Sequence, residues 1–126
     1  MDLLDTRLYD LIGEEGFARL VAAFYRRVPD DNILGPLYPR HDMAGAETRL
    51  REFLIQRFGG PDTYSQKYGH PRLRMRHAPF PVTRAARDRW VGLMEQALAE
   101  SHLPPEARTI LRSFFDDAAT FLINRE

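Results

Sequence analysis

The sequence predicts an all-α protein, and three observations support this. Apolar residues recur at three- and four-residue spacing in four segments of the chain. Proline and glycine separate these segments, and no segment alternates apolar and polar residues as a half-buried strand does. With 126 residues, of which 44% are hydrophobic, the chain can bury a core, so we expect one domain over residues 1–126.

The first part of the chain predicts a short helix followed by a long one. Leu4, Leu8 and Leu11 share one face of a helix over residues 3–11, which Gly13 breaks. The long helix begins at Glu14 and ends before Pro29. Its apolar stripe consists of Phe17, Leu20, Val21, Phe24, Tyr25 and Val28.

A bend and a third helix are expected next. Residues 30–32 form a turn, and residues 33–39 are apolar but contain Pro36 and Pro39, so we expect a compact buried bend. Asp42 can cap the following helix, which the run at residues 59–61 stops. The apolar side of this helix carries Met43, Ala46, Leu50, Phe53 and Leu54.

The second half predicts a polar loop, one helical turn and two longer helices. Residues 61–70 are polar and turn-rich, with Tyr64 and Tyr68 as anchors. The turn starts with Pro71 at its first helical position. Thr83 caps the next helix, and residues 103–106 open the last one. The stripes are Ala86, Trp90, Leu93, Met94, Ala97 and Leu98, then Ala107, Ile110, Leu111, Phe114, Phe115, Ala118, Phe121 and Leu122.

The helical turn that ends at His77 offers one imidazole to a pocket. Pro79 prevents the turn from continuing, and Leu73 shares a face with His77 because the two are four residues apart. Arginines alternate through the same turn. One neutral nitrogen and several cations suit an iron macrocycle that carries carboxylates, although a histidine at such a position is more often a surface or core residue.

Composition excludes several other functions. The chain has no cysteine, which excludes disulfides, iron–sulfur clusters and covalent haem attachment. Positive and negative residues balance at 18 each, so a nucleic-acid partner is not expected. No apolar run is long enough to span a membrane, and no signal-peptide region follows Met1, so we expect a cytoplasmic protein without a membrane partner.

Two phenols and one indole stand in apolar surroundings. Tyr25 and Trp90 belong to helical stripes, and Tyr38 lies in the apolar bend. Core packing is the usual role of such residues, but a buried O–H or N–H needs an acceptor. A cavity containing a hydrogen-bond acceptor would give all three a purpose.

The chain closely resembles the group II truncated haemoglobins. The resemblance rests on residues 53–64, on residues 69–80 with the sequence GHPRLRMRHAPF, on Trp90, and on the pairs at residues 24–25 and 38–39. It covers nearly the whole chain. It implies a truncated globin fold, a two-over-two helical sandwich around one haem b held without a covalent bond.

The resemblance also implies roles for individual residues. His77 matches the proximal ligand of the iron, and Tyr25, Tyr38 and Trp90 match polar residues on the distal side. Ala46 stands where ordinary globins place a distal histidine, so the sixth position stays open. The expected haem contacts are Leu50, Phe53, Leu54, Leu73 and Met94, with Tyr64, Arg76, Arg49 and Arg72 near the propionates.

We therefore expect a haem protein that binds dioxygen, nitric oxide, carbon monoxide or peroxide, with Trp90, Tyr38 and Tyr25 stabilising the ligand. Oxidation of nitric oxide or turnover of peroxide would make it an enzyme with a reductase as partner. The alternative is a cofactor-free helical module whose arginine rim binds an acidic partner. Monomer and homodimer are both compatible with the sequence.

Overall fold

The structure is a computed structural model that describes residues 5–125, and within this range it contains helices and no strand. The prediction of an all-α fold is therefore confirmed. The helices are α1 (Leu8–Arg27), α2 (Met43–Arg57), α3 (Thr63–Tyr68), α4 (Leu73–His77), α5 (Arg84–Glu100) and α6 (Pro105–Phe121), with 3-10 turns at Asp5–Arg7, Gly35–Leu37 and Arg40–Asp42.

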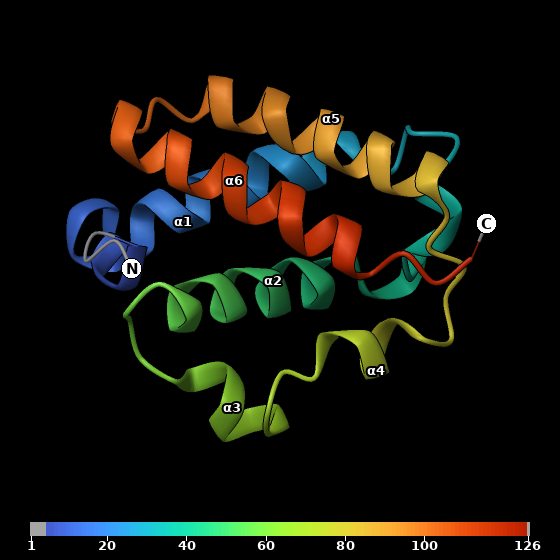
Figure 1. Cartoon of the computed structure of the whole chain (residues 1–126), viewed down its shortest axis with the longest axis horizontal. Helices are drawn as coiled ribbons and strands as arrows, with labels where there is room; N and C mark the ends of the chain where they lie inside the picture. Colours follow the sequence, from blue (N-terminus) through green and yellow to red (C-terminus); the bar gives the residue numbers. More distant parts are fainter. Residues whose placement is uncertain (1–4, 126) are drawn as a thin grey trace.

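The four long helices form two packed pairs. Helix α1 packs against α2, α5 packs against α6, and α1 also contacts α5, which joins the pairs into the predicted two-over-two sandwich. Figure 1 shows α5 and α6 along the top, α2 across the middle, and the short helices α3 and α4 along the bottom. The connections around α4 therefore pass below α2.

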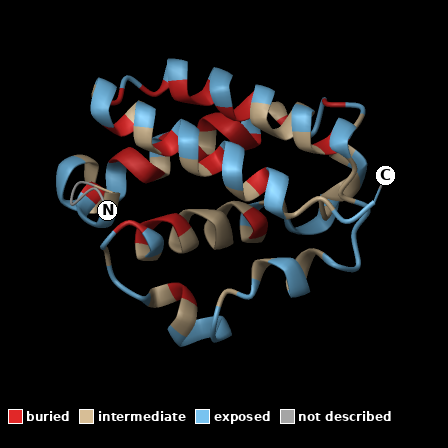
Figure 2. Cartoon of the chain, viewed as in Figure 1, coloured by how far each residue is buried: buried red, intermediate tan, exposed pale blue. Residues whose placement is uncertain are grey.

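The core lies between the long helices. Phe17, Phe24 and Phe58 are fully buried, as are Leu54, Leu98 and Leu111. Burial of one such side chain stabilises the fold by about 1.5–3 kcal/mol. Figure 2 shows that buried residues gather on α1, α5 and α6 and on parts of α2, whereas α4 and most of α3 are half-buried or exposed. The short helices thus depend on few core contacts.

Three helix starts follow the local sequence signals. The Asp42 carboxylate accepts a hydrogen bond from the Gly45 N–H at 3.2 Å, and the Thr83 hydroxyl accepts one from the Ala86 N–H at 3.0 Å. Pro105 occupies the first position of α6. Gly13 interrupts α1 with φ 67° and ψ 177°, so the predicted break is a kink between two merged helical segments.

The predicted face of the first short helix is wrong at Leu11. Leu8 is buried, but Leu11 is 45% exposed. The kink at Gly13 turns the first segment away from the axis of the rest of α1, so its exposed face cannot be read from spacing alone. Residues 1–4, which include Leu4, lie outside the described residues.

Two further expectations about the second half are corrected. Residues 63–68 form helix α3 instead of a loop, because the Gln56 side chain accepts from the Ser65 N–H and donates to its hydroxyl. Pro71 does not start the next helix. The backbone of Arg72 adopts a left-handed conformation with φ 42°, so α4 begins only at Leu73.

Candidate functional site

A cavity of about 790 Å³ lies between α4 and the long helices. Its walls come from all six α-helices, α1 to α6, together with the bend at residues 34–39. Most of the lining is apolar, and the polar groups are few, which is typical of a site for a small organic molecule.

His77, the last residue of α4, lines this cavity. Its Nδ1 lies 2.8 Å from the Leu73 carbonyl oxygen, one helical turn earlier. When Nδ1–H donates to this carbonyl, Nε2 is the unprotonated ring nitrogen and remains available to the cavity. Metal-binding histidines are oriented by the same kind of hydrogen bond to a backbone carbonyl.

Arg76 shapes the loop that positions α4. Its Nε donates to the Pro71 carbonyl at 2.7 Å, and its Nη2 donates to the carbonyls of Tyr68 at 2.7 Å and His70 at 3.1 Å. The guanidinium carbon also lies 5.8 Å from the centre of the Tyr64 ring. Arg76 thus holds the turn between α3 and α4 and contributes to the cavity wall.

Trp90 and Tyr38, which also line the cavity, form a hydrogen-bonded pair. The Trp90 Nε1–H donates to the Tyr38 hydroxyl oxygen at 3.1 Å. Because the Tyr38 oxygen accepts this bond, its own O–H hydrogen remains available to another acceptor. The rings of Tyr38 and Tyr25 meet edge to face with their centres 5.7 Å apart.

Tyr25 uses its hydroxyl differently. The Tyr25 O–H donates to the Ala46 carbonyl oxygen at 3.2 Å, which links α1 to α2. Tyr25 lines the cavity, but its donor is already satisfied by the protein. Of the two phenols, Tyr38 is therefore the one whose hydrogen is free.

Both phenols are protonated at neutral pH. Burial, aided by the nearby Tyr38, raises the pKa of Tyr25 well above its ordinary value. Loss of hydration raises the pKa of Tyr38 to about 12, against a smaller lowering by the Trp90 hydrogen bond. Both groups can therefore act as donors and not as anions.

An ion pair fixes the bend that carries Tyr38 to the helix that carries Trp90. The buried Asp31 carboxylate accepts from Arg89 Nη1 at 2.5 Å, and also from the Leu34 N–H at 2.7 Å and the Ile33 N–H at 3.0 Å. Burial alone raises the pKa of Asp31, but the hydrogen bonds from Leu34, Arg89 and Ile33 outweigh it and hold the pKa below its usual value. We call Asp31 and Arg89 the bend latch.

The structure brings most of the expected site residues together. The cavity is lined by Tyr25, Tyr38, Arg49, Leu50, Phe53, Leu54, Tyr64, Leu73, Arg76, His77 and Trp90. Arg49 lies at its edge, 3.4 Å from the Asp42 carboxylate.

Three expected residues do not line the cavity. Ala46 is buried, and its carbonyl oxygen accepts the hydrogen bond from the Tyr25 hydroxyl. Met94 is 1% exposed within the core, four residues beyond Trp90. Arg72 lines a separate groove on the other side of Leu73.

Sequence reasoning missed the contribution of the last helix to the cavity. Phe114, Phe115, Ala118, Ala119 and Leu122 line it, as do Phe80, Val82 and Ala86 from the start of α5 and the segment before it. The apolar stripe of α6 was a visible signal, but a stripe alone does not separate core contacts from cavity contacts.

A family model described as "Bacterial-like globin" matches residues 7–124. The chain belongs to the bacterial-like globin family. This globin is 37% identical over 117 residues to a group 2 truncated hemoglobin of Bacillus subtilis, with 93% of this chain and 88% of the relative covered. It is 38% identical over 122 residues to a group 2 truncated hemoglobin of Lotus japonicus, with 94% and 73% covered. It is a truncated haemoglobin of group 2, as the resemblance predicted.

Solved structures agree with the fold of this globin. It superposes on the hemoglobin of Chloroflexus aurantiacus with a TM-score of 0.91 at 46% identity, covering 94% of this chain and 98% of the other. The hemoglobin of Thermobifida fusca gives a TM-score of 0.90 at 44% identity, covering 94% and 97%. The prediction of a truncated globin fold is therefore confirmed.

Family membership implies a haem cofactor and the binding of diatomic ligands. Three features of the cavity suit a haem: its size, its apolar walls, and a histidine nitrogen left available by the Leu73 carbonyl. The family thus favours the haem interpretation over a cofactor-free module. Among the described residues, no helix is long and apolar enough to cross a membrane.

Proposed function

We propose that this globin holds haem b in the 790 Å³ cavity through His77 and binds dioxygen and other diatomic ligands reversibly. The main support for this proposal is the hydrogen bond of 2.8 Å between His77 Nδ1 and the Leu73 carbonyl oxygen. This bond orients the ring and increases the basicity of Nε2. The bound haem would supply the iron centre that binds the diatomic ligand.

Other residues of the cavity wall would contact the haem faces and its propionates. Phe53 and Leu54 of α2, with Leu73 of α4, would contact the faces of the macrocycle and exclude water. Arg49, Tyr64 and Arg76 stand where their donors could meet propionates. Arg72 lines the neighbouring groove and not the cavity, so we assign the propionate contacts to the other three residues.

Tyr38 and Trp90 would stabilise the diatomic ligand as a pair. The indole N–H donates to the phenol oxygen at 3.1 Å, which polarises the phenol and strengthens its own donation into the cavity. A neutral hydrogen bond contributes about 0.5–1.5 kcal/mol, which slows ligand release by about two- to tenfold. A solved neighbour from Bacillus subtilis, 37% identical with a TM-score of 0.88, is described as oxygen-avid, which agrees with a donor-rich pocket.

Nitric oxide oxidation or peroxide turnover is an extension of this proposal. Slow ligand release suits scavenging or redox chemistry better than bulk transport. The Trp90 ring lies 5.1 Å from that of Phe24 and 5.4 Å from that of Phe115, so an aromatic cluster surrounds the indole. Consumption of nitric oxide or peroxide by the haem-loaded protein with an added reductase distinguishes an enzyme from a carrier.

The test of haem ligation uses His77→Gly. We expect the wild-type protein to give an intense Soret band with haem, and the variant to lose it. Added imidazole should restore the band, because it can occupy the space left by the ring and coordinate the iron.

The matched control is His102→Asn. His102 is exposed and has φ 56°, a conformation that asparagine tolerates. This variant should retain the wild-type band. A Soret band that is unchanged in His77→Gly without imidazole would overturn the assignment of His77.

A further inference from the structure

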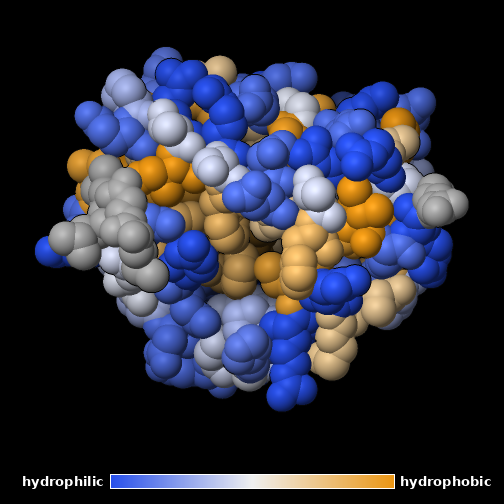
Figure 3. Space-filling view, viewed as in Figure 1, coloured by the Kyte–Doolittle hydropathy of each residue, from blue (hydrophilic) through white to orange (hydrophobic). Residues whose placement is uncertain are grey.

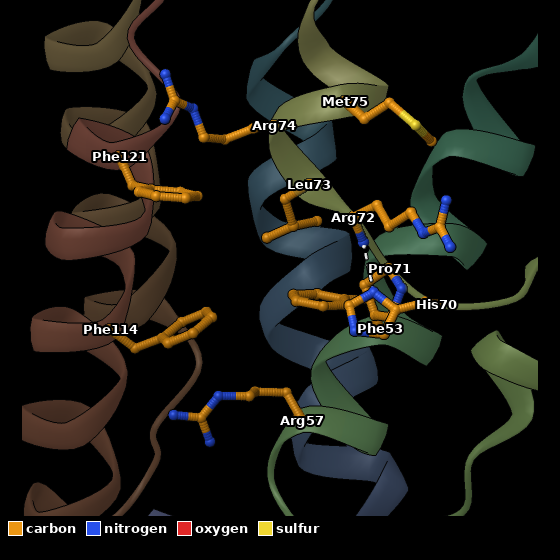
Figure 4. A pocket seen from close by; sticks show the side chains of 10 residues that line it. All are labelled: Phe53, Arg57, His70, Pro71, Arg72, Leu73, Arg74, Met75, Phe114 and Phe121. Carbon is orange, nitrogen blue, oxygen red and sulfur yellow. Dashed lines mark hydrogen bonds between the residues drawn. The ribbon is translucent and has the colours of Figure 1, made fainter.

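A groove of about 460 Å³ lies outside the cavity, between α6 and the segment that leads into α4. Figure 4 shows Phe114 and Phe121 on the α6 wall, facing Leu73 and Phe53 on the opposite wall. Figure 3 shows a hollow with apolar atoms around it in the middle of the face below α6. Leu73, Phe53 and Phe114 also line the cavity, so they form the partition between the two spaces.

The groove leaves large apolar side chains in contact with solvent. Phe121 and Met75 are each 57% exposed, and both line it. Apolar side chains gathered around a concave surface are typical of a ligand-binding groove. A volume of this size is within the range of sites that bind small organic molecules.

Three arginines line the groove: Arg57 and Arg74 stand at its opposite ends, whereas the Arg72 side chain points away from α6 (Figure 4). Arg57 lies at one end, with its guanidinium 5.1 Å from the Phe114 ring and 3.3 Å from the Asp5 carboxylate. Arg74 lies at the other end, 5.1 Å from the Phe121 ring. No carboxylate within residues 5–125 forms an ion pair with Arg74. Among the described residues, Arg74 is thus a cation without an ion pair that stands beside the apolar side chains of α6.

We propose that this groove binds a medium-chain fatty-acid anion. The carboxylate would pair with Arg74, and the aliphatic chain would lie along Phe121, Leu73 and Phe114. Phe114 and Phe121 are seven residues apart on α6, which corresponds to about 10 Å, the length of a chain of about eight to ten carbons. A second carboxylate is not required, because Asp5 already compensates Arg57.

The test is calorimetric titration of the haem-loaded protein with decanoate, below its micelle concentration. We expect saturable binding of one decanoate per chain, and binding of decanol that is at least about tenfold weaker because the alcohol lacks the charge. Phe121→Glu should abolish decanoate binding, since it removes an apolar wall and places a like charge beside the carboxylate. Arg74→Gln should weaken binding by about tenfold.

Arg84→Gln is the matched control, because Arg84 is an exposed arginine of α5 that lines neither space. It should bind decanoate like the wild type. Equal affinities for decanoate and decanol, or unchanged binding in Arg74→Gln or Phe121→Glu, would overturn the proposal. So would loss of the Soret band during the titration of both wild type and Phe121→Glu, which would place decanoate in the haem cavity. The heat of binding does not depend on ligand chemistry at iron, so failure of the proposed function would not imitate these results.

Discussion

Tyr38 and Tyr25 are both phenols in the cavity wall, yet their hydrogen bonds assign them different roles. Tyr38 accepts from Trp90 and keeps its own hydrogen available, whereas Tyr25 donates its hydrogen to the Ala46 carbonyl. The resemblance predicted that Tyr25, Tyr38 and Trp90 all stabilise the ligand, and the sequence did not separate the two phenols. The geometry instead favours Tyr38 as the direct donor, with Trp90 supporting it.

Replacement of each phenol by phenylalanine tests this difference. Tyr38→Phe should speed dioxygen release by about two- to tenfold, since one neutral hydrogen bond is lost. Tyr25→Phe should have a smaller effect on release, because the Tyr25 hydroxyl donates to the Ala46 carbonyl. Stopped-flow measurement of the dissociation rate on the haem-loaded variants gives the comparison, and a larger effect in Tyr25→Phe would reverse the assignment.

The raised pKa of Tyr38 predicts how the protein responds to alkali. The pKa rises from 10.0 to about 12 on folding, so the folded state retains a proton that the unfolded chain loses. The contribution of this group to stability is therefore complete below pH 10 and is lost as the pH rises towards 12. Chemical denaturation at several pH values should show a shallower loss of stability over this range in Tyr38→Phe than in the wild type. Equal slopes would contradict the raised pKa.

At the scale of elements, the bend latch sets where Tyr38 stands relative to Trp90. Asp31 satisfies two N–H groups of the bend and Arg89 of α5 at once, so it connects the two elements that carry the donor pair. A hydrogen-bonding carboxylate buried in this way stabilises the bend, and its loss leaves polar groups without partners.

Asp31→Asn should therefore lower the free energy of unfolding by about 1–3 kcal/mol and speed ligand release. The neighbouring Asp30→Asn is the control, because Asp30 is exposed. Thermal denaturation and the dioxygen dissociation rate measure the two effects. A loss of stability with an unchanged dissociation rate would mean that the latch does not position Tyr38.

Local chemistry explains which elements could be predicted from the sequence. The caps at Asp42 and Thr83 and the stripes of the long helices depend on neighbouring residues. The structure confirms the caps, and it confirms the stripes except at Phe121, which is 57% exposed at the end of α6. Helix α3 depends on Gln56, nine residues before Ser65, and the start of α4 depends on the left-handed Arg72. Such contacts have no signal in periodicity.

The candidate site shows the same division. His77, Tyr38 and Trp90 could be singled out because their chemistry needs a partner. The part of the wall that α6 contributes could not be predicted. The apolar residues of its stripe give no sign of which will face the core and which the cavity until the helices are packed.

At the scale of the whole molecule, the sandwich surrounds a space that its own side chains do not fill. A ligand that occupies the 790 Å³ cavity of the folded state and not the unfolded chain raises stability in proportion to its affinity. Haem at about a hundred times its dissociation constant should add about 2.7 kcal/mol. Scanning calorimetry of the haem-free and haem-loaded protein should show this as a higher melting temperature, and equal melting temperatures would argue against haem in the cavity.

The most direct test of the account is a crystal structure of the haem-loaded protein. We predict iron bonded to His77 Nε2, with Nδ1 still donating to the Leu73 carbonyl and Tyr38 on the opposite side of the macrocycle. Iron bonded to another side chain, or a His77 ring turned towards solvent, would contradict it.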